Sequence, residues 1–450
     1  MLTPAAIKDL KLRLRGPVLE PGAENFDLLR RVWNGMVDKR PALIAQCAGS
    51  ADIAACVTFA REHGVLLSVR GGGHNYAGKA VCSGGLMLDL SLMKGMKVDA
   101  ARRTVRAQAG LKLGEFDRET QKYGLATPLG VATTTGISGL TLGGGYGWLA
   151  GKFGLACDNV TWAEVVTADG NILECSESRN ADLFWALRGA GANFGVVTEL
   201  EYKLHPVSTV LGGPIFHPLC KESFRFYDEM SRSAPDELTM LGSAMTGPDG
   251  APAFATVVCY CGSPAEGERL LEPLRTFGRP LADMIQQRPY VEMQSLFDAS
   301  FPPGRRYYNK AHNISVIGDE AADTVLRYSN PLPTPSSSVA FQQLHGAAGR
   351  VAMTATAFPH RYDHHVVWVD PVGDDPADDE RMISWARECW QALTPFVDPA
   401  VYVNALDDVL EAGERPVREA YGANYDRLRV LKKRYDPTNL FCQNSNIKPD

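Results

Sequence analysis

The stretch Val69-Arg70-Gly71-Gly72-Gly73-His74-Asn75-Tyr76-Ala77-Gly78 decides how the rest of the chain is interpreted. It follows an apolar run over residues 64–68, which predicts a short buried strand. Three consecutive glycines can curl their backbone N–H groups around an anion such as a phosphate. Arg70 places a positive charge beside this cradle, and His74 is placed to contact whatever carries the phosphate. The alternative is a glycine-rich surface turn with an incidental histidine.

The composition indicates a soluble globular protein of two or three domains. The 450 residues are 45% hydrophobic and 22% charged, and the net charge is −6. An acidic balance argues against a general nucleic-acid binder. The first fifteen residues alternate charges with leucines and predict an amphipathic helix rather than a signal peptide, and no run is long enough to span a membrane. The ten scattered cysteines form no CxxC pair, so we expect reduced thiols and a cytoplasmic location.

The first half of the chain reads as alternating strands and helices around the glycine loop. We expect strands over 42–45, 86–90, 104–109, 161–167 and 171–175 and helices over 51–63 and 113–123. The first of these helices is expected to be capped near Ser50 or Asp52. The strand–helix–strand order would deliver the glycine loop to the end of a strand, where phosphate-binding loops often lie.

A second glycine-rich stretch covers residues 130–147 and a third covers 189–195. The second lacks the strand, helix and acidic residue that a Rossmann fingerprint requires, so we reject that interpretation. Two alternatives stay open for it: a backbone surface packed along a flat ligand, or a structural hairpin. From about Pro214 the glycine motifs stop, and strands such as 255–260 alternate with helices such as 267–276 and 379–393, which predicts an α+β domain.

Five segments together resemble the berberine-bridge-enzyme group of the vanillyl-alcohol-oxidase superfamily of FAD-linked oxidases, whose FAD domain is of the PCMH type. They are RGGGHNYAG at 70–78, GISGLTLGGGYGWLAGKFGLACDNV at 136–160, VVTADG at 165–170, DLFWALRGAGANFGVVT at 182–198 and NYDRLRVLKKRYDPTNLF at 424–441. The resemblance implies an α+β fold with a two-part FAD-binding domain, residues 1–206 and 411–450. It also implies an inserted substrate domain, residues 207–410, with an antiparallel sheet covered by helices.

The resemblance implies FAD as the cofactor, joined through the His74 ring to the flavin 8α-methyl group. Many relatives carry a second tether, a cysteine in Gly-Val-Cys, but this chain has Gly130-Val131-Ala132, so we expect a single covalent bond. Cys157 lies outside that motif and reads as a small buried hydrophobe. The residues expected to bind the cofactor are Arg70, Gly71, Gly72, Gly73, His74, Asn75, Gly78, Gly130, Gly136, Ser138, Gly139, Thr141, Gly144, Gly147, Asp158, Gly195, Val197, Asn444 and Asn446.

The reaction implied is oxidation of a C–H bond in an alcohol or amine, with molecular oxygen reoxidising the flavin to give hydrogen peroxide. Tyr425 is the first candidate for a base or orienting group, followed by Tyr421 and by Tyr402, which lies with Asn404 in an expected strand. Each tyrosine could equally be ordinary packing, because its usual pKa near 10 is high for a base. Thr141 matches the position beside flavin C4a that gates oxygen in relatives.

Two other interpretations of the chain stay open. A dehydrogenase with poor oxygen reactivity would use the same flavin, and a protein that only binds flavin or another ligand is the non-enzymatic alternative. The expected partners are a small-molecule substrate and oxygen, with neither nucleic acid nor membrane. His345, His364 and His365 lack the spacing of a metal site. The aromatics Phe341, Trp368 and Tyr308 suit a core or an aromatic substrate, and substrate and oligomeric state are left unassigned.

Overall fold

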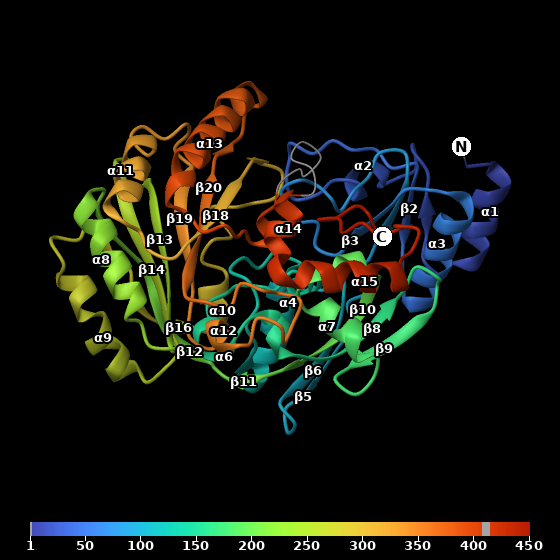
Figure 1. Cartoon of the computed structure of the whole chain (residues 1–450), viewed down its shortest axis with the longest axis horizontal. Helices are drawn as coiled ribbons and strands as arrows, with labels where there is room; N and C mark the ends of the chain where they lie inside the picture. Colours follow the sequence, from blue (N-terminus) through green and yellow to red (C-terminus); the bar gives the residue numbers. More distant parts are fainter. Residues whose placement is uncertain (1, 407–414) are drawn as a thin grey trace.

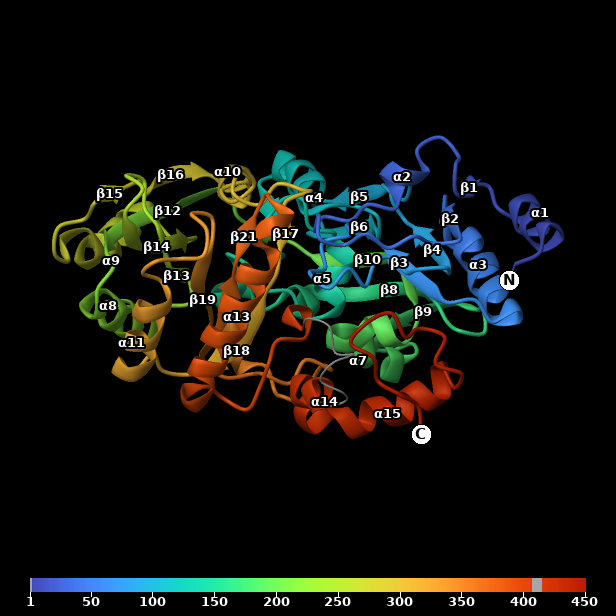
Figure 2. The same cartoon turned by 90° about the horizontal axis from the view of Figure 1, so that it is seen from above.

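The computed structural model describes residues 2–406 and 415–450. Two lobes lie side by side, and the C-terminal helices return to pack on the lobe formed by the N-terminal half (Figures 1 and 2). The predicted α+β class is confirmed. The domain boundaries stay a prediction, and the boundary expected at 410/411 lies outside the described residues.

A small sheet in the first lobe carries the glycine loop. Its strand order is β1 (Val18–Leu19), β2 (Leu43–Gln46), β4 (Leu86–Asp89) and β3 (Leu67–Arg70), with β2, β4 and β3 parallel. Helix α3 (Ser50–His63) joins β2 to β3 and packs against α1 (Pro4–Arg13). The cap expected near Ser50 or Asp52 is Gly49, directly before Ser50, and not Asp52. The Asp52 carboxylate instead accepts the N–H groups of Arg15, Gly16 and Ala48, which ties the N-terminal segment down.

A five-stranded antiparallel sheet forms the centre of the first lobe. Its order is β5 (Met96–Asp99), β6 (Thr104–Gln108), β10 (Val196–Lys203), β8 (Val160–Val166) and β9 (Ile172–Ser176). The hairpin predicted over 161–175 is confirmed. The helices α4 (Leu113–Thr120), α5 (Ile137–Leu142), α7 (Ala181–Ala190) and α15 (Tyr425–Tyr435) share one hydrophobic core with this sheet. The short strands β7 (Leu125–Ala126) and β11 (His205–Pro206) pair beside it.

An eight-stranded antiparallel sheet forms the second lobe. Its order is β15 (Ala282–Asp283), β12 (Thr209–Pro218), β14 (Pro252–Tyr260), β13 (Leu238–Thr246), β19 (Ser338–Leu344), β20 (His364–Asp370) and β18 (Lys310–Ile314), and β16 (Gln286–Pro289) also pairs with β12. The helices α8 (Lys221–Arg232), α9 (Pro264–Thr276), α11 (Asp319–Tyr328) and α13 (Asp379–Leu393) bury a core against it. Figure 1 shows α8, α9 and α11 on the side away from the first lobe, which leaves the other sheet face to meet it.

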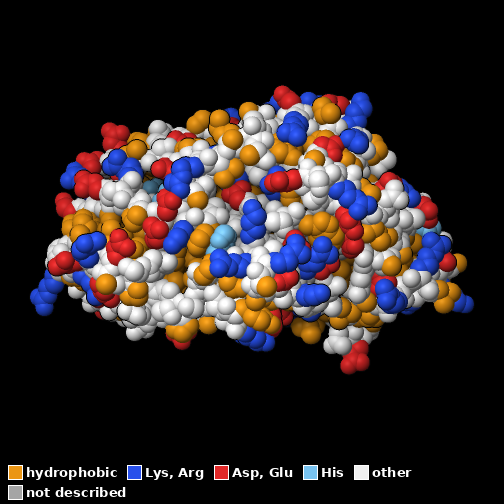
Figure 3. All heavy atoms as spheres, turned by 90° about the horizontal axis from the view of Figure 1, so that it is seen from below, with side chains coloured by type: hydrophobic (Ala, Val, Ile, Leu, Met, Phe, Trp, Pro, Cys, Tyr) orange, Lys and Arg blue, Asp and Glu red, His pale blue; other side chains and the backbone are white. Residues whose placement is uncertain are grey.

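Short elements complete the chain. They are α2 (Phe26–Leu29), α6 (Ala150–Phe153), α10 (Tyr290–Gln294), α12 (Ala347–Arg350), α14 (Arg415–Tyr421), β17 (Arg306–Tyr307) and β21 (Val372–Gly373), with several 3₁₀ turns. Acidic, basic and apolar side chains are interspersed on the face shown in Figure 3. Within the described ranges, no helix has the length and hydrophobicity needed to cross a bilayer.

Candidate active site

A cavity of about 730 Å³ lies where the two lobes meet. Its wall on the first lobe contains the glycine loop after β3, the turn before α5 and the segment before β10. The second lobe contributes one face of its large sheet, and residues 441–445 close the cavity from the C-terminal side. Segments far apart in the sequence therefore form a single cavity large enough for a dinucleotide and a small substrate.

The first two glycine-rich stretches touch each other through their backbones. A Cβ added to Gly72 would lie 2.2 Å from the backbone nitrogen of Gly136, and a Cβ on Gly71 would lie 2.7 Å from Ser138 Oγ. Ser138 Oγ in turn donates to the carbonyl of Ala109, which fixes this junction to the end of β6. The second stretch forms helix α5 rather than a hairpin. Of its two interpretations, the structure therefore supports a backbone surface beside a ligand.

The backbone along this junction offers unused hydrogen-bond donors. None of the N–H groups of residues 71–75 has an acceptor among the residues that the structure describes. Gly139 lines the cavity, and a Cβ added there would meet nothing within 4 Å. Asn444 also lines it, but its buried side-chain oxygen, which has no partner within the described ranges, is an acceptor and does not add to these donors. Free donors around bare backbone suit an anionic group such as the FAD pyrophosphate.

His74 lies on the cavity wall with a fixed ring. The ring stacks on Trp33 at 4.1 Å between centroids, and Trp33 stacks in turn on Tyr307 at 3.6 Å. His74 Nε2 lies 3.1 Å from Thr134 Oγ1. Burial lowers the pKa of His74 to about 4. The imidazole is therefore neutral at physiological pH, the form in which histidine acts as a nucleophile.

Most of the residues expected to bind the cofactor line this cavity. They are Gly71, Gly72, Gly73, His74, Asn75, Gly130, Gly136, Ser138, Gly139, Gly195, Val197 and Asn444. Ala132, where relatives carry a cysteine, lines it as well. The remaining expected residues lie outside the lining, so the structure does not bring them to the cavity: Arg70, Gly78, Thr141, Gly144, Gly147, Asp158 and Asn446.

Several of these residues make structural contacts, and their part in cofactor binding stays a prediction. Arg70 pairs with Asp89 and donates to the carbonyls of Leu29 and Arg31, so it supports the glycine loop from behind. Thr141 exchanges a hydrogen bond with the Tyr202 hydroxyl at 2.9 Å. Three of the glycines allow close packing: Cβ atoms would clash with Val37 at Gly78, with Phe358 at Gly144 and with the Leu129 carbonyl at Gly147.

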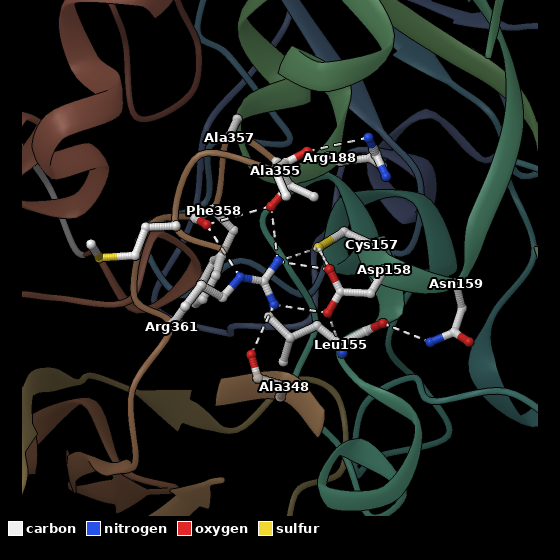
Figure 4. A network of polar contacts seen from close by, with 12 residues as sticks. Leu155, Cys157, Asp158, Asn159, Arg188, Ala348, Ala355, Ala357, Phe358 and Arg361 are labelled. Carbon is white, nitrogen blue, oxygen red and sulfur yellow. Dashed lines mark hydrogen bonds and ion pairs between the residues drawn. The ribbon is translucent and has the colours of Figure 1, made fainter. Parts of the chain in front are cut away.

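Asp158 belongs to a buried network that joins the two lobes (Figure 4). Its carboxylate forms two bonds of 2.7 and 2.8 Å with Arg361, whose side chain is fully buried, and accepts the N–H of Leu155. The last contact makes Asp158 a cap of the 3₁₀ turn over Ala156–Asn159. Cys157 is buried beside this pair, and burial raises the pKa of its thiol. This supports the interpretation of Cys157 as a buried, inert side chain.

The three candidate tyrosines lie in different places in the structure. Tyr425 is 2% exposed, lies in the core of the first lobe and packs under Arg418, so it does not reach the cavity. Tyr421 and Tyr402 line the cavity. The Tyr402 hydroxyl accepts the N–H of Gly145 at 3.1 Å and the amide of Asn404 at 2.8 Å, and burial raises its pKa. Its segment forms a 3₁₀ turn rather than the expected strand.

The sequence reasoning missed a carboxylate on the opposite wall. Asp370 ends β20, lines the cavity and is 8% exposed, and its Oδ1 has no partner among the described residues. Burial raises the pKa of Asp370 to about 8, against the opposing effect of a hydrogen bond with Tyr76. A carboxylate at the end of the otherwise apolar strand HHVVWVD, two residues after Trp368, was the available signal. The same face holds Trp368, whereas Phe341 and Tyr308 belong to the core.

The three histidines considered for a metal point to different neighbours. His364 Nε2 contacts the Tyr146 hydroxyl, whereas His365 Nε2 contacts Ser231 Oγ on the other side of the strand. His345 is buried near Gly151. In the part of the chain that the structure describes, no three His, Cys, Asp or Glu side chains are arranged to hold a metal ion.

Comparison with known proteins identifies the cofactor. A family model described as an FAD binding domain matches residues 41–176, and one described as berberine and berberine-like matches residues 401–448. An FAD-linked oxidoreductase of Dictyostelium discoideum is 33% identical over 443 residues, which are 97% of this chain and 95% of that protein. The chain belongs to the berberine-bridge-enzyme-like family of FAD-linked oxidoreductases.

Other members of the berberine-bridge-enzyme-like family align over nearly the whole chain. (R)-6-hydroxynicotine oxidase of Paenarthrobacter nicotinovorans is 32% identical over 98% of each protein. The crystal structure of 6-hydroxy-D-nicotine oxidase from Arthrobacter nicotinovorans gives a TM-score of 0.87 at 32% identity, covering 98% of this chain and 99% of that one. Chitooligosaccharide oxidase gives a TM-score of 0.86 at 24% identity, which shows the fold alone. The resemblance drawn from the five sequence segments is confirmed.

Proposed function

We propose that this FAD-linked oxidoreductase is an oxidase of an alcohol or amine C–H bond and holds its FAD through a single bond to His74. The observation that carries the proposal is a neutral, stacked imidazole on the wall of a cavity with a cradle of free N–H donors. Bound FAD would supply the redox chemistry, accepting a hydride at N5 and passing two electrons to O₂ to give hydrogen peroxide.

The surroundings of His74 support its role as the tether. Thr134 Oγ1 engages only Nε2. A ring proton on Nε2, donated to Thr134, would leave the Nδ1 lone pair for bond formation, in place of the hydrogen bond that the ring makes to the His74 backbone. The stack on Trp33 restricts rotation of the ring, so this lone pair keeps one direction. Ala132 supports the single bond, because its methyl side chain cannot form a thioether although it lines the same cavity.

Asp370 replaces the tyrosines as the proposed proton acceptor. A carboxylate with a pKa near the working pH is well matched to general-base catalysis, which typically contributes about 10²–10⁴-fold in rate. Its unpartnered Oδ1 is available to a donor on the substrate. Tyr402 accepts two hydrogen bonds and has a raised pKa, so its proposed role is to orient rather than to deprotonate. Tyr76 would hold the other side of the Asp370 carboxylate.

The test is replacement of His74 by alanine, with His63→Ala as control because His63 is exposed at the end of α3. Wild-type protein should precipitate yellow in acid and give a fluorescent band in a denaturing gel. His74→Ala should release its flavin into the supernatant, while His63→Ala behaves like wild type. Flavin that stays attached to His74→Ala would contradict the tether. Reoxidation of dithionite-reduced enzyme in air, with peroxide detected, separates an oxidase from a dehydrogenase.

A further inference from the structure

One segment of the second lobe, residues 298–307, holds both neighbours of the His74 ring. The ring stacks on Trp33, and its Nε2 lies beside Thr134 Oγ1. These two neighbours are far apart in the sequence, one before β2 and the other before α5. The 298–307 segment lies between α10 and β18, and it contacts the surroundings of both neighbours across the junction of the lobes.

The first neighbour, Trp33, is fixed by hydrogen bonds and by stacking. Its indole Nε1 donates to the Phe301 carbonyl at 3.0 Å, and its own carbonyl accepts the N–H of Gly304 at 2.8 Å. The Tyr307 ring stacks on the indole at 3.6 Å between centroids, and the His74 ring stacks on it at 4.1 Å. Since two rings this close cannot share one face, the indole lies between them.

Asn34 joins the glycine loop to the same segment. Its amide Nδ2 donates to the carbonyls of Tyr76 and Tyr307 at 2.7 and 2.8 Å, and its Oδ1 accepts the N–H of Tyr307 at 3.1 Å. Asn34 is buried, so bulk water does not compete for these bonds. The loop that carries His74 is therefore connected to Tyr307 by hydrogen bonds as well as through the stacked rings.

The second neighbour of the ring is held from the start of the same segment. The Asp298 carboxylate accepts both the N–H and the hydroxyl of Thr133, which directly precedes Thr134. Hydrogen bonds to a charged acceptor are stronger than those between neutral groups. The 298–307 segment therefore restricts the position of Thr134 as well as that of Trp33.

The segment is itself anchored in the second lobe. Its last two residues form β17, which pairs with β21 (Figure 2). Arg305 forms an ion pair with Asp374, and its guanidinium also donates to Ser336 Oγ. Arg306 forms an ion pair with Asp379 at the start of α13. The contacts between this segment and the first lobe therefore require that the two lobes are docked on each other.

We propose that residues 298–307 position His74 for its bond to FAD, with Tyr307 and Asp298 as positioning residues, so that the bond forms only where the second lobe is docked on the first. This inference rests on the tether proposed above and adds its control by the second lobe. Bond formation requires the reacting atoms to be held about 3–3.5 Å apart in the correct direction, and a displacement of about 1 Å can slow a reaction about 10²-fold.

The attachment step balances with the oxidant of the proposed function. One ring nitrogen of His74 bonds to the 8α carbon, and the imidazole loses its ring proton. The 8α carbon gives up one hydrogen as its C–H bond breaks. Two protons and two electrons are thus removed in total, and both pairs pass to O₂, which leaves as hydrogen peroxide.

The test follows attached and total flavin in the full-length protein. The chain is produced under riboflavin limitation, supplied with FAD in air and sampled over time. Acid precipitation measures the attached flavin, and absorption after gel filtration measures all bound flavin. We expect Tyr307→Leu and Asp298→Ala to bind as much flavin as wild type but to attach it about 10–10²-fold more slowly, the cost of a displacement of up to about 1 Å. Tyr307→Phe keeps the stacked ring and should restore the wild-type rate.

Two control variants make the same chemical changes elsewhere in the second lobe. Tyr308→Leu alters the next residue, whose ring packs against the core of that lobe. Asp323→Ala removes an exposed carboxylate that pairs with Lys221. Both variants should attach flavin at the wild-type rate. A Tyr308→Leu protein that is as slow as Tyr307→Leu would overturn the inference, because any damage to the lobe would then have the same effect.

The remaining outcomes separate this inference from the proposed tether. Wild-type attachment rates in Tyr307→Leu and Asp298→Ala would overturn the positioning role and leave the bond to His74 in place. Total flavin that falls together with attached flavin would show that the segment only supports the cavity, and would overturn the positioning role as well. Wild-type protein that releases all its flavin in acid would contradict the tether itself, and the inference with it.

Discussion

Gly72 and Gly136 lie back to back, and neither position has room for a side chain. A Cβ on Gly72 would approach the nitrogen of Gly136 to 2.2 Å, and a Cβ on Gly136 would approach the nitrogen of Gly72 to 2.3 Å. The obstacle in both cases is backbone, which cannot move aside as a flexible side chain can. The proposed cradle for the cofactor therefore depends on two glycines from separate stretches that are close only in the folded chain.

Replacing either glycine by alanine should separate the two loops. We expect Gly72→Ala and Gly136→Ala each to lower the free energy of unfolding by about 1–3 kcal/mol, the usual cost of overpacking. Both variants should also lose flavin, because the loops carry the N–H donors. The measurements are urea unfolding and the ratio of flavin to protein after purification.

Two further glycine variants distinguish an effect on the stability of the protein from an effect on flavin binding. Gly318→Ala should change little, since a Cβ there meets nothing within 4 Å and the site lies at the start of α11. Gly139→Ala also adds a Cβ in open space, but on the cavity wall. It should therefore unfold like wild type and bind flavin less well. Equal stability of Gly72→Ala and Gly318→Ala would contradict the backbone contact.

Ala132→Cys should allow a second covalent bond to the flavin. The residue lines the cavity in the segment where relatives carry a cysteine, and the N–H and hydroxyl of neighbouring Thr133 are held by Asp298. The double variant His74→Ala/Ala132→Cys should then keep flavin after acid precipitation, whereas His74→Ala alone should not. Peptide mass spectrometry would locate the bond. Flavin lost from the double variant would place Ala132 out of reach of the ring.

The pKa of Asp370 predicts a rise of activity with pH. A proton acceptor must be ionised, and burial raises the pKa of this carboxyl to about 8. The rate of flavin reduction at saturating substrate should therefore increase as pH rises through about 8 and then level off. Asp370→Asn should lose this rise and react about 10²–10⁴-fold more slowly. Stopped-flow reduction between pH 6 and 9 makes the measurement, and an unchanged profile in the variant would exclude Asp370 as the acceptor.

Ionisation of the Asp370 carboxyl should lower the stability of the protein as the pH rises, whereas it raises the activity. Its ordinary pKa in the unfolded chain is near 3.8, so between about pH 4 and 8 the folded protein binds more protons than the unfolded chain. This contribution to the free energy of unfolding therefore falls as pH rises through that range. Asp370→Asn should remove the decline and be more stable than wild type at pH 8.5, measured by thermal unfolding of the two proteins side by side.

Lys432 should hold the C-terminal wall of the cavity in place. Its buried ammonium group pairs with Asp436 at 2.7 Å and donates to the carbonyls of Asn193 and Phe441. Lys432→Met leaves the buried Asp436 carboxylate without its cation, which typically costs about 3–5 kcal/mol. Amide exchange should rise over 440–447 and flavin content should fall. Lys433→Met is the matched control because Lys433 is exposed. Identical behaviour of the two variants would exclude the role of Lys432 in holding this wall in place.

The sequence was most informative where backbone contacts decide the structure. Gly71, Gly72 and Gly136 marked the cradle because the backbone approaches so closely at these positions that there is no room for a Cβ. The helix over residues 379–393 was predicted with the bounds that the structure shows, because its apolar positions follow a helical period. Glycines 144 and 147 show the limit of this reasoning, since the same signal also marks close packing between segments of the chain itself.

The opposite wall could not be predicted from the sequence. Asp370 and Tyr76 meet only because β20 lies beside the glycine loop across the junction of the lobes, a relationship that no local pattern contains. Tyr425 was the first choice because its motif is distinctive, but the direction of its side chain depends on how α15 packs on α7. Asp158 shows the same difficulty, because its partner Arg361 lies about two hundred residues later in the chain.

The closure of the cavity by residues 441–445 has a consequence for biosynthesis. His74 leaves the ribosome long before those residues have been translated, so the proposed bond to the flavin would have to wait until the end of the chain has folded back. A nascent chain that stops short of residue 441 would lack this wall and could not enclose the dinucleotide. Permanent attachment would then occur only on chains that have passed this last folding step, and the yellow colour would report on the completeness of translation.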